Sequence, residues 1–238
     1  MTIVSLNNVT KQYHLGKTTV PAVRGVSLRV EAGGFIALCG PSGSGKTSLL
    51  NIIGCLDKPT TGDVHVLGND VLSMGDAKLS ELRSRSIGFI FQTFNLIPVL
   101  TAYENIEYPL LLTGVGSRER RERVMNLLCR VGLKDHARHR PSELSGGQQQ
   151  RVAIARALVT HPKLVLADEP TANLDTETGT QIIQLMRDLR DELGCTFLFS
   201  THDLRVLRYV DKVYRMEDGR ITLEGTSDDM APLSTRNT

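Results

Sequence analysis

The sequence has no apolar stretch of the roughly 18 residues that a membrane-spanning helix requires. Its first residues also lack the basic segment followed by an apolar segment that marks a secretory signal. Basic and acidic side chains nearly balance, 28 against 26, so there is no large excess of positive charge to coat a nucleic acid. These absences predict a cytoplasmic globular protein without nucleic acid as a partner.

Cysteine does not occur in the patterns that would give it chemistry. The sequence has four cysteines, which are far apart and form no C-x-x-C pair: Cys39, Cys55, Cys129 and Cys195. This spacing argues against a disulfide framework or a zinc site, and it favours packing in the interior. His136 and His139 lie among charged residues, in a stretch typical of a solvated connector rather than of a metal cluster.

A glycine-rich loop is the most informative pattern that the sequence does contain. Residues 40–47 read GPSGSGKT and fit the phosphate-binding pattern G-x-x-x-x-G-K-[ST]. The apolar run 35–39 suits a buried parallel strand, and residues 48–53 continue as a helix. Backbone N–H groups and the helix N-terminus would point at phosphate oxygens, whereas a plain strand-to-helix turn has little need of Lys followed by Thr. The phosphate-contacting residues that the pattern predicts are Gly40, Pro41, Ser42, Gly43, Ser44, Gly45, Lys46, Thr47 and Ser48.

Two carboxylates follow a second apolar strand, which is predicted at residues 164–167. Ligands bind at the carboxyl edge of an open parallel sheet, so Asp168 and Glu169 are expected beside the glycine-rich loop. Asp168 and the Thr47 hydroxyl are hard oxygen donors that suit Mg²⁺, and Lys46 is expected to reach the β- and γ-phosphates. Glu169 is then placed to orient or deprotonate the attacking water. The alternative is an exposed acidic pair without a ligand.

Two further strand ends carry polar residues. Residues 195–200 form another apolar strand, and His202 follows it, on the edge expected to hold the phosphate loop. From there His202 is within reach of the γ-phosphate, although a histidine at a strand end also serves as an ordinary structural residue. Residues 87–91 form a strand that ends at Gln92, where the chain leaves the sheet.

The remaining segments divide into strands and helices. Residues 3–9 and 20–30 suit strands of an antiparallel edge, with Tyr13 in the loop between them. After Gln92 the pattern becomes helical, with a capping box opening a helix at 101–112 and a longer amphipathic helix at 117–131. The sequence therefore predicts an α/β core that is interrupted by a helical insert.

Together these motifs resemble the nucleotide-binding subunit of ATP-binding cassette (ABC) transporters, over nearly all of residues 1–225. The most diagnostic match is LSGGQ at residues 144–148, the signature of that family. The resemblance implies an α/β fold with a RecA-like P-loop NTPase core, an antiparallel β subdomain and an inserted α-helical subdomain. The division that it implies is a core with its β subdomain at 1–92 and 161–225, a helical subdomain at 93–160 and a polar tail at 226–238.

The resemblance also implies ATP and Mg²⁺ as ligands, and a head-to-tail homodimer that forms on ATP binding. Tyr13 would stack on adenine, and the catalytic residues would be Glu169, His202 and Lys46. The expected metal-binding residues are Thr47, Gln92 and Asp168. The residues expected to act on the nucleotide of the opposite subunit are Ser145, Gly146, Gly147 and Gln148, with Asp175 in the neighbouring D-loop.

A closer resemblance is to the subgroup for lipoprotein release, macrolide efflux and division-associated complexes, and residues 54–59, 91–98 and 144–151 carry it. Departures are small: Thr47 and Ser48 replace the usual Ser-Thr order, and Ala172 stands where the subgroup commonly has Gly. The resemblance implies a separate permease, FtsX-like with an extracytoplasmic domain, and a peripheral location on the cytoplasmic face of the cell membrane. Candidate permease contacts are Phe94, Leu96, Ile97 and Pro98.

The function expected from the resemblance is hydrolysis of MgATP at two composite sites, which drives export or extraction of a lipoprotein, lipid, peptide or drug. The alternative is a mechanotransmission ATPase that controls an extracytoplasmic protein through its membrane partner, without transport. A soluble ATPase acting on ribosomes or DNA is disfavoured, because the chain has a single cassette, no long coiled-coil insert and no basic excess.

Overall fold

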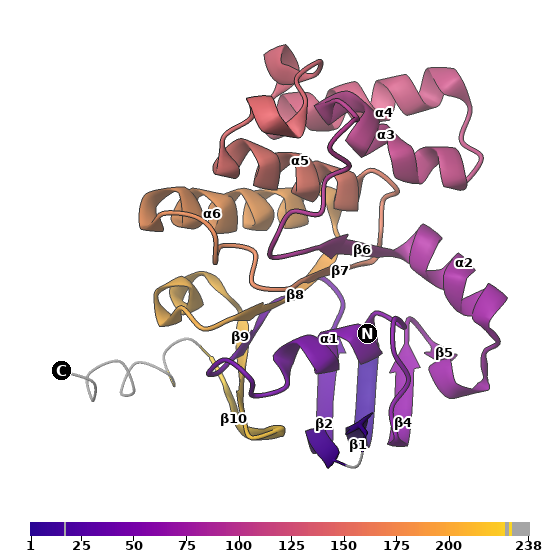
Figure 1. Cartoon of the computed structure of the whole chain (residues 1–238), viewed down its shortest axis with the longest axis vertical. Helices are drawn as coiled ribbons and strands as arrows, with labels where there is room; N and C mark the ends of the chain where they lie inside the picture. Colours follow the sequence, from indigo (N-terminus) through magenta and orange to yellow (C-terminus); the bar gives the residue numbers. More distant parts are fainter. Residues whose placement is uncertain (17, 227–228, 230–238) are drawn as a thin grey trace.

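The computed structural model describes residues 1–16, 18–226 and 229 of the chain. A six-stranded sheet in the order β10-β9-β3-β8-β7-β6 lies at its centre (Figure 1). All its strands are parallel except β10, which is antiparallel to β9. The strands are β3 (Phe35–Cys39), β6 (Ile87–Ile90), β7 (Leu164–Ala167), β8 (Thr196–Thr201), β9 (Lys212–Glu217) and β10 (Arg220–Gly225). Every residue of β3, β7 and β8 is buried, as their continuous apolar sequences predict.

A second sheet is antiparallel, in the order β2-β1-β4-β5. Its strands are β1 (Thr2–Leu15), β2 (Thr18–Glu31), β4 (Thr61–Val66) and β5 (Asn69–Asp70). The predicted antiparallel edge is confirmed, but its first two strands are longer than expected. Tyr13 lies inside β1 opposite Val20, so its placement in a loop was wrong. The hairpin extends past the apolar positions because main-chain pairing continues where side chains are no longer buried.

Six α-helices complete the described fold, and short 3₁₀ turns connect several of them. The helices are α1 (Lys46–Ile53), α2 (Asp76–Ser86), α3 (Ala102–Leu112), α4 (Ser117–Arg130), α5 (Gly146–Leu158) and α6 (Thr176–Leu193). The 3₁₀ turns are Val71–Ser73, Lys134–His136, Pro141–Glu143 and Leu204–Tyr209. The Thr101–Glu104 capping box predicted for α3 is confirmed. In α4 the apolar stripe that includes Val124 and Leu128 is buried, also as predicted.

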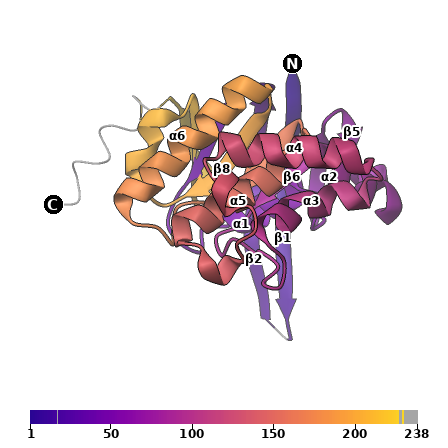
Figure 2. The same cartoon turned by 90° about the horizontal axis from the view of Figure 1, so that it is seen from above.

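Two hydrophobic clusters lie on opposite faces of the central sheet. Phe35, Phe197 and Phe199 point to the face that α3 to α6 cover, and Figure 2 shows these helices from above. Ile36 and Leu38, which alternate with Phe35 along β3, point instead to α1 and the antiparallel sheet. The helical segment thus shares one continuous core with the parallel sheet. The residue boundaries of the subdomains given above stay a prediction.

Two smaller expectations are corrected. Cys39, Cys55 and Cys195 are buried as predicted, but Cys129 is exposed on α4. The connector around His136 is not fully solvated, because His136 and His139 are half-buried with ring centroids 5.0 Å apart. Across the described part of the chain, none of the helices combines the length and hydropathy needed to traverse a bilayer.

Candidate active site

The glycine-rich loop joins β3 to α1 and is held by close backbone packing. Gly45 has φ 101°, and a Cβ there would lie 2.2 Å from the carbonyl oxygen of Ala22. Only glycine fits this position, because a side chain meets both a strained conformation and a backbone clash. The Lys46 side chain turns back along the loop, where its Nζ donates to the carbonyl oxygens of Gly40 (2.8 Å) and Pro41 (2.9 Å). A buried positive charge therefore lies at the centre of the loop.

Asp168 follows β7 and is fixed by two hydroxyl groups. Thr47 Oγ1 donates to Asp168 Oδ2 at 2.9 Å, and Ser200 Oγ donates to Asp168 Oδ1 at 2.6 Å. Ser200 also accepts from the backbone N–H of Glu169 at 2.8 Å. Ser200 belongs to none of the motifs in the sequence. Its one sequence signal is a small polar residue at the carboxyl end of an otherwise apolar strand.

Glu169 lies between two cationic or proton-carrying side chains. Its Oε1 is 3.4 Å from Lys46 Nζ, and its Oε2 is 2.8 Å from His202 Nδ1. Because an ionised carboxylate only accepts hydrogen bonds, Nδ1 carries the proton in this contact. Glu169 also has φ 47°, a left-handed conformation that is uncommon outside glycine and concentrates at functional sites. The Glu169 side chain is 13% exposed and the His202 side chain is 60% exposed, so the pair lies at the mouth of a pocket.

A cavity of about 610 Å³ brings these groups together. Most of its lining comes from the glycine-rich loop and the start of α1, and residues 20–22 of β2 together with Gln92, Glu169 and His202 complete it. Gln92 is held in turn by Asn173, whose Nδ2 donates to the Gln92 carbonyl oxygen at 2.9 Å. The predicted convergence of strand ends on one edge is thereby confirmed, since β3, β7 and β8 are parallel neighbours.

The donor chemistry around Thr47 fits Mg²⁺. The Thr47 hydroxyl, the Asp168 carboxylate and the Gln92 side-chain amide supply oxygen ligands, which this ion prefers. In the described residues there is no group of three or more His, Cys, Asp or Glu side chains that could hold a metal by itself. An ion here would therefore share its coordination with phosphate oxygens and water, as Mg²⁺ does in nucleotide sites.

Tyr13 lies next to the cavity rather than in its lining. Its hydroxyl donates to Asp57 Oδ2 at 2.9 Å and is 3.4 Å from Ser48 Oγ, at the start of α1. Lys11 Nζ lies 4.9 Å from the centroid of its ring. Asp57 lies in the segment 54–59 that carries the subgroup resemblance, and Lys11 lies in no motif, but nothing in the sequence shows that either would contact Tyr13.

The signature residues are grouped elsewhere, at the start of α5. Ser145 is the N-cap residue, and its Oγ accepts from the Gln148 backbone N–H while Gln148 Oε1 accepts from the Ser145 N–H. Asp175 is the N-cap residue of α6, where its Oδ1 accepts from the Thr178 backbone N–H at 3.0 Å, and hydrogen bonding from Thr178 holds the pKa of its carboxyl below the usual range. None of residues 145–148 lines the cavity at the glycine-rich loop. Within one chain the structure does not bring the signature to that pocket.

Comparison with known proteins agrees with this geometry. Residues 23–172 match the family described as ABC transporter. An ABC transporter ATP-binding protein of Thermotoga maritima is 51% identical over 92% of this chain and 93% of its own length. The macrolide export ATP-binding/permease protein MacB of Syntrophobacter fumaroxidans is 46% identical over 98% of this chain, which spans 33% of that longer protein.

The solved structures give the same result. A dimeric ATP-binding cassette, MJ0796 of Methanocaldococcus jannaschii, in a post-hydrolysis state bound to ADP and Pi, has a TM-score of 0.87 and 45% identity. The similarity covers 94% of this chain and 99% of that one. The expected family and the RecA-like α/β fold are thereby confirmed, as is ATPase activity. The chain belongs to the ABC transporter family and is an ATP-binding ATPase subunit of the MacB and MJ0796 type.

Proposed function

We propose that this chain hydrolyses MgATP at two composite sites of a head-to-tail homodimer and thereby drives a separate membrane permease. The observation that carries the proposal is the position of Glu169. Its carboxylate is held between Lys46 and His202 at the glycine-rich loop, where an attacking water would meet the γ-phosphate. The left-handed backbone at Glu169 keeps the carboxylate there.

The loop supplies the phosphate contacts. Backbone N–H groups of residues 40–48 and the N-terminus of α1 would hold the phosphate oxygens, and Lys46 would leave its carbonyl partners for the β- and γ-phosphates. Tyr13 would stack on adenine, since its bond to Asp57 places its ring beside Ser48.

Hydrolysis then rests on a small set of side chains. Glu169 orients the water and accepts its proton, while Lys46 and His202 stabilise the charge that develops on the transferred phosphoryl group. Thr47, Asp168 and Gln92 would hold Mg²⁺. When bound, the ion neutralises charge on the phosphate oxygens. Ser200 positions Asp168 and Glu169 through its two hydrogen bonds.

The separate positions of the two halves of the site support the proposed dimer. Ser145 and its neighbours cap α5 outside the pocket of their own chain, so the pocket that they complete belongs to a second chain. The positive end of α5 and the N–H groups of Gly146 and Gly147 suit a γ-phosphate. Asp175 would lie at the same interface. MJ0796, which is similar over nearly its full length, was solved as a dimer.

The permease is the proposed partner, and it would place the chain at the cytoplasmic face of the membrane. MacB is an ATP-binding/permease protein, and the similarity to this chain covers 33% of its length. The surface offered to the permease includes the loop from Phe94 to Pro98, beside a groove on β6. Export or extraction of a lipoprotein, lipid, peptide or drug is the proposed use of this coupling.

Mixed dimers test the composite sites. Lys46→Ala breaks the glycine-rich loop and Ser145→Ala breaks the signature, so each variant alone should be inactive. In a head-to-tail mixed dimer one site combines both defects and the other has none, so mixing the two variants should restore part of the phosphate release. If mixed dimers form without any recovery of turnover, the head-to-tail arrangement is wrong.

Affinity capture tests the permease. The tagged Glu169→Gln chain should retain a membrane protein when it is purified from its native membranes with ATP, and mass spectrometry identifies that protein. A permease with a large external domain would support the proposal. A soluble ATP-bound dimer without a membrane partner would contradict it.

A further inference from the structure

His136 is a half-buried histidine next to the signature that takes no part in the proposed hydrolysis. It ends the 3₁₀ turn Lys134–His136, and its Nε2 lies 3.3 Å from Nε2 of Gln148. Its Nδ1 is buried and has no hydrogen-bond partner among the described residues. Buried polar atoms are normally paired, so the state of both ring nitrogens needs an explanation.

The capping box of α5 fixes which end of the Gln148 amide faces His136. Gln148 Oε1 accepts from the Ser145 backbone N–H at 2.9 Å, so the Nε2 end of the same amide points to the imidazole. An amide nitrogen donates hydrogen bonds and does not accept them. In this contact His136 Nε2 is therefore the acceptor, and the proton of the neutral ring is on Nδ1.

The other tautomer of His136 fits this environment less well. With the proton on Nε2, two donors would face each other, and the buried Nδ1 would be an acceptor without a donor. If the Gln148 amide turned over to relieve this, its Nε2 would face the Ser145 N–H and the capping box would open. A proton on Nδ1 leaves a single N–H group unpaired, so it costs the least in unmatched donors and acceptors.

Main-chain hydrogen bonds hold the turn that carries His136 against the first turn of α3. The carbonyl oxygen of Ala137 accepts from the Tyr103 N–H at 2.9 Å. The carbonyl oxygen of His139 accepts from the Ala102 N–H at 2.8 Å. These bonds satisfy N–H groups that a helix start leaves without an intrahelical partner. The imidazole therefore extends towards the signature from a backbone that is held in place.

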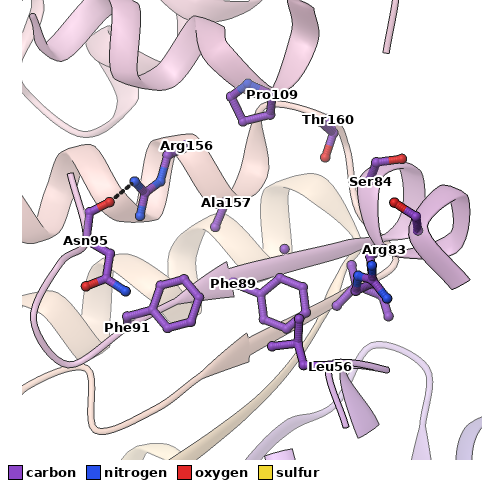
Figure 3. A pocket seen from close by; sticks show the side chains of 13 residues that line it. Leu56, Arg83, Ser84, Phe89, Phe91, Asn95, Pro109, Arg156, Ala157 and Thr160 are labelled. Carbon is purple, nitrogen blue, oxygen red and sulfur yellow. Dashed lines mark hydrogen bonds between the residues drawn. The ribbon is translucent and has the colours of Figure 1, made fainter. Parts of the chain in front are cut away.

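The other end of α5 is held by Arg156. Its Nη2 donates to the Phe94 carbonyl oxygen at 2.8 Å. Its guanidinium also donates to the carbonyl oxygen of Asn95, at the end of the groove on β6 that lies opposite Arg83 (Figure 3). Because this end of α5 is anchored, the loss of a contact at Gln148 would change the first turn of the helix, where the signature lies.

We propose that His136 is a positioning residue for the signature: by accepting from Gln148, it holds the amide in the orientation that closes the capping box of Ser145. The box fixes the Ser145 backbone next to the N–H groups of Gly146 and Gly147, which are proposed to meet the nucleotide of the opposite subunit. The inference rests on the proposed function, because it adds a residue to one half of the composite site.

A double-mutant cycle tests the contact through ATP turnover. His136→Ala should lower kcat by about three- to tenfold, as loss of one neutral hydrogen bond does. In a Gln148→Ala chain, His136→Ala should have no further effect, because the donor is already gone. His136→Gln keeps an acceptor at a similar reach and should stay within about twofold of wild type. If the effects of the two alanine substitutions simply multiply, the side chains act independently and the inference is overturned.

His139→Ala is the matched control. It removes a second half-buried imidazole from the same connector, whose ring centroid lies 5.0 Å from that of His136. In the described part of the chain its side chain makes no hydrogen bond with Gln148. Denaturant unfolding should show a loss of stability for both histidine variants, but His139→Ala should keep kcat within about twofold of wild type. An equal loss of kcat in both would assign the effect to packing and overturn the inference.

The tautomer of His136 gives a measurement that does not depend on turnover. In a chain whose six histidines carry isotope-labelled nitrogen, NMR chemical shifts distinguish a ring nitrogen with a proton from one without. His136→Gln identifies the signals of this residue by their loss. In mildly alkaline buffer Nδ1 should carry the proton and Nε2 should not, and Gln148→Ala should weaken this preference. A proton on Nε2 in the wild-type chain would overturn the inference.

The mixed dimers of Lys46→Ala and Ser145→Ala separate this inference from the proposed function. If they recover turnover while the effects of His136→Ala and Gln148→Ala multiply, the role of His136 is wrong and the composite site stands. If they form without recovery, the composite site is wrong and the inference fails with it.

Discussion

Glu169 and His202 are joined by a 2.8 Å contact between Oε2 and Nδ1, and the second carboxylate oxygen faces Lys46 at 3.4 Å. The two oxygens thus have different partners, one a proton donor and the other a fixed charge. This arrangement orients the carboxylate towards the cavity at the glycine-rich loop. A base held in this way accepts a proton without having to reorganise first.

Glu169→Gln should lower ATP turnover by about 100-fold or more, because an amide cannot accept the proton of the attacking water. ATP binding should persist, since the phosphate contacts come from the glycine-rich loop. Phosphate release and the affinity for a fluorescent ATP analogue measure the two effects separately. Glu177→Gln, in the exposed first turn of α6, is the matched control and should turn over ATP normally. Normal turnover in Glu169→Gln would show that another group is the base.

Ser145→Ala should separate the structural and functional roles of the signature. Ser145 and Thr101 each open a helix with a capping box, so either alanine variant should lower the free energy of unfolding by about 1 kcal/mol. Only Ser145→Ala should also abolish most ATP turnover. Denaturant unfolding and phosphate release on both variants check this. A loss of turnover of the same size in Thr101→Ala would assign the effect to stability alone.

Gly88→Ala should destabilise the fold, because a Cβ on β6 would lie 2.3 Å from the carbonyl oxygen of Ala157 on α5. Such an overpacked contact costs about 1–3 kcal/mol. Gly179→Ala is the control and should instead raise the free energy of unfolding. A Cβ at position 179 would lie 3.4 Å from its nearest neighbour, Thr171 Cβ, and alanine stabilises a helix by about 0.5–1 kcal/mol relative to glycine. Chemical denaturation of both variants tests whether β6 and α5 are packed this closely.

The four thiols should differ in reactivity. Burial raises the pKa of Cys55 and Cys195 to about 11 and raises that of Cys39 as well. A raised pKa keeps these three side chains in the unreactive thiol form at pH 8, so they should react slowly there. The exposed Cys129 should account for the fast reaction with a thiol reagent. Cys129→Ser should remove that fast phase, and the unfolded chain should show all four thiols. Two or more fast thiols in the native wild type would contradict the burial.

Much of the site could be predicted because its residues sit at fixed offsets from strand ends. The loop pattern located Lys46 and Thr47, and the apolar strands before Asp168 and His202 placed both at one sheet edge, which the parallel order of β3, β8 and β7 confirms. Ser200 was missed because one serine in a buried strand does not show which carboxylate it will meet. Helix α2 was also missed, since Leu79 is its one buried residue and it therefore lacks a helical apolar period.

The sequence by itself determined the chemistry of the nucleotide pocket, since short-range patterns specify how a loop, a strand end and a helix start are built. Only the tertiary structure decided which distant residues meet. It placed Tyr13 inside a strand beside Asp57, bonded Ser200 to Asp168, and set Arg83 and Arg156 at opposite ends of one groove. These relationships depend on how sheets and helices pack on a shared core, and no local pattern encodes the register of that packing.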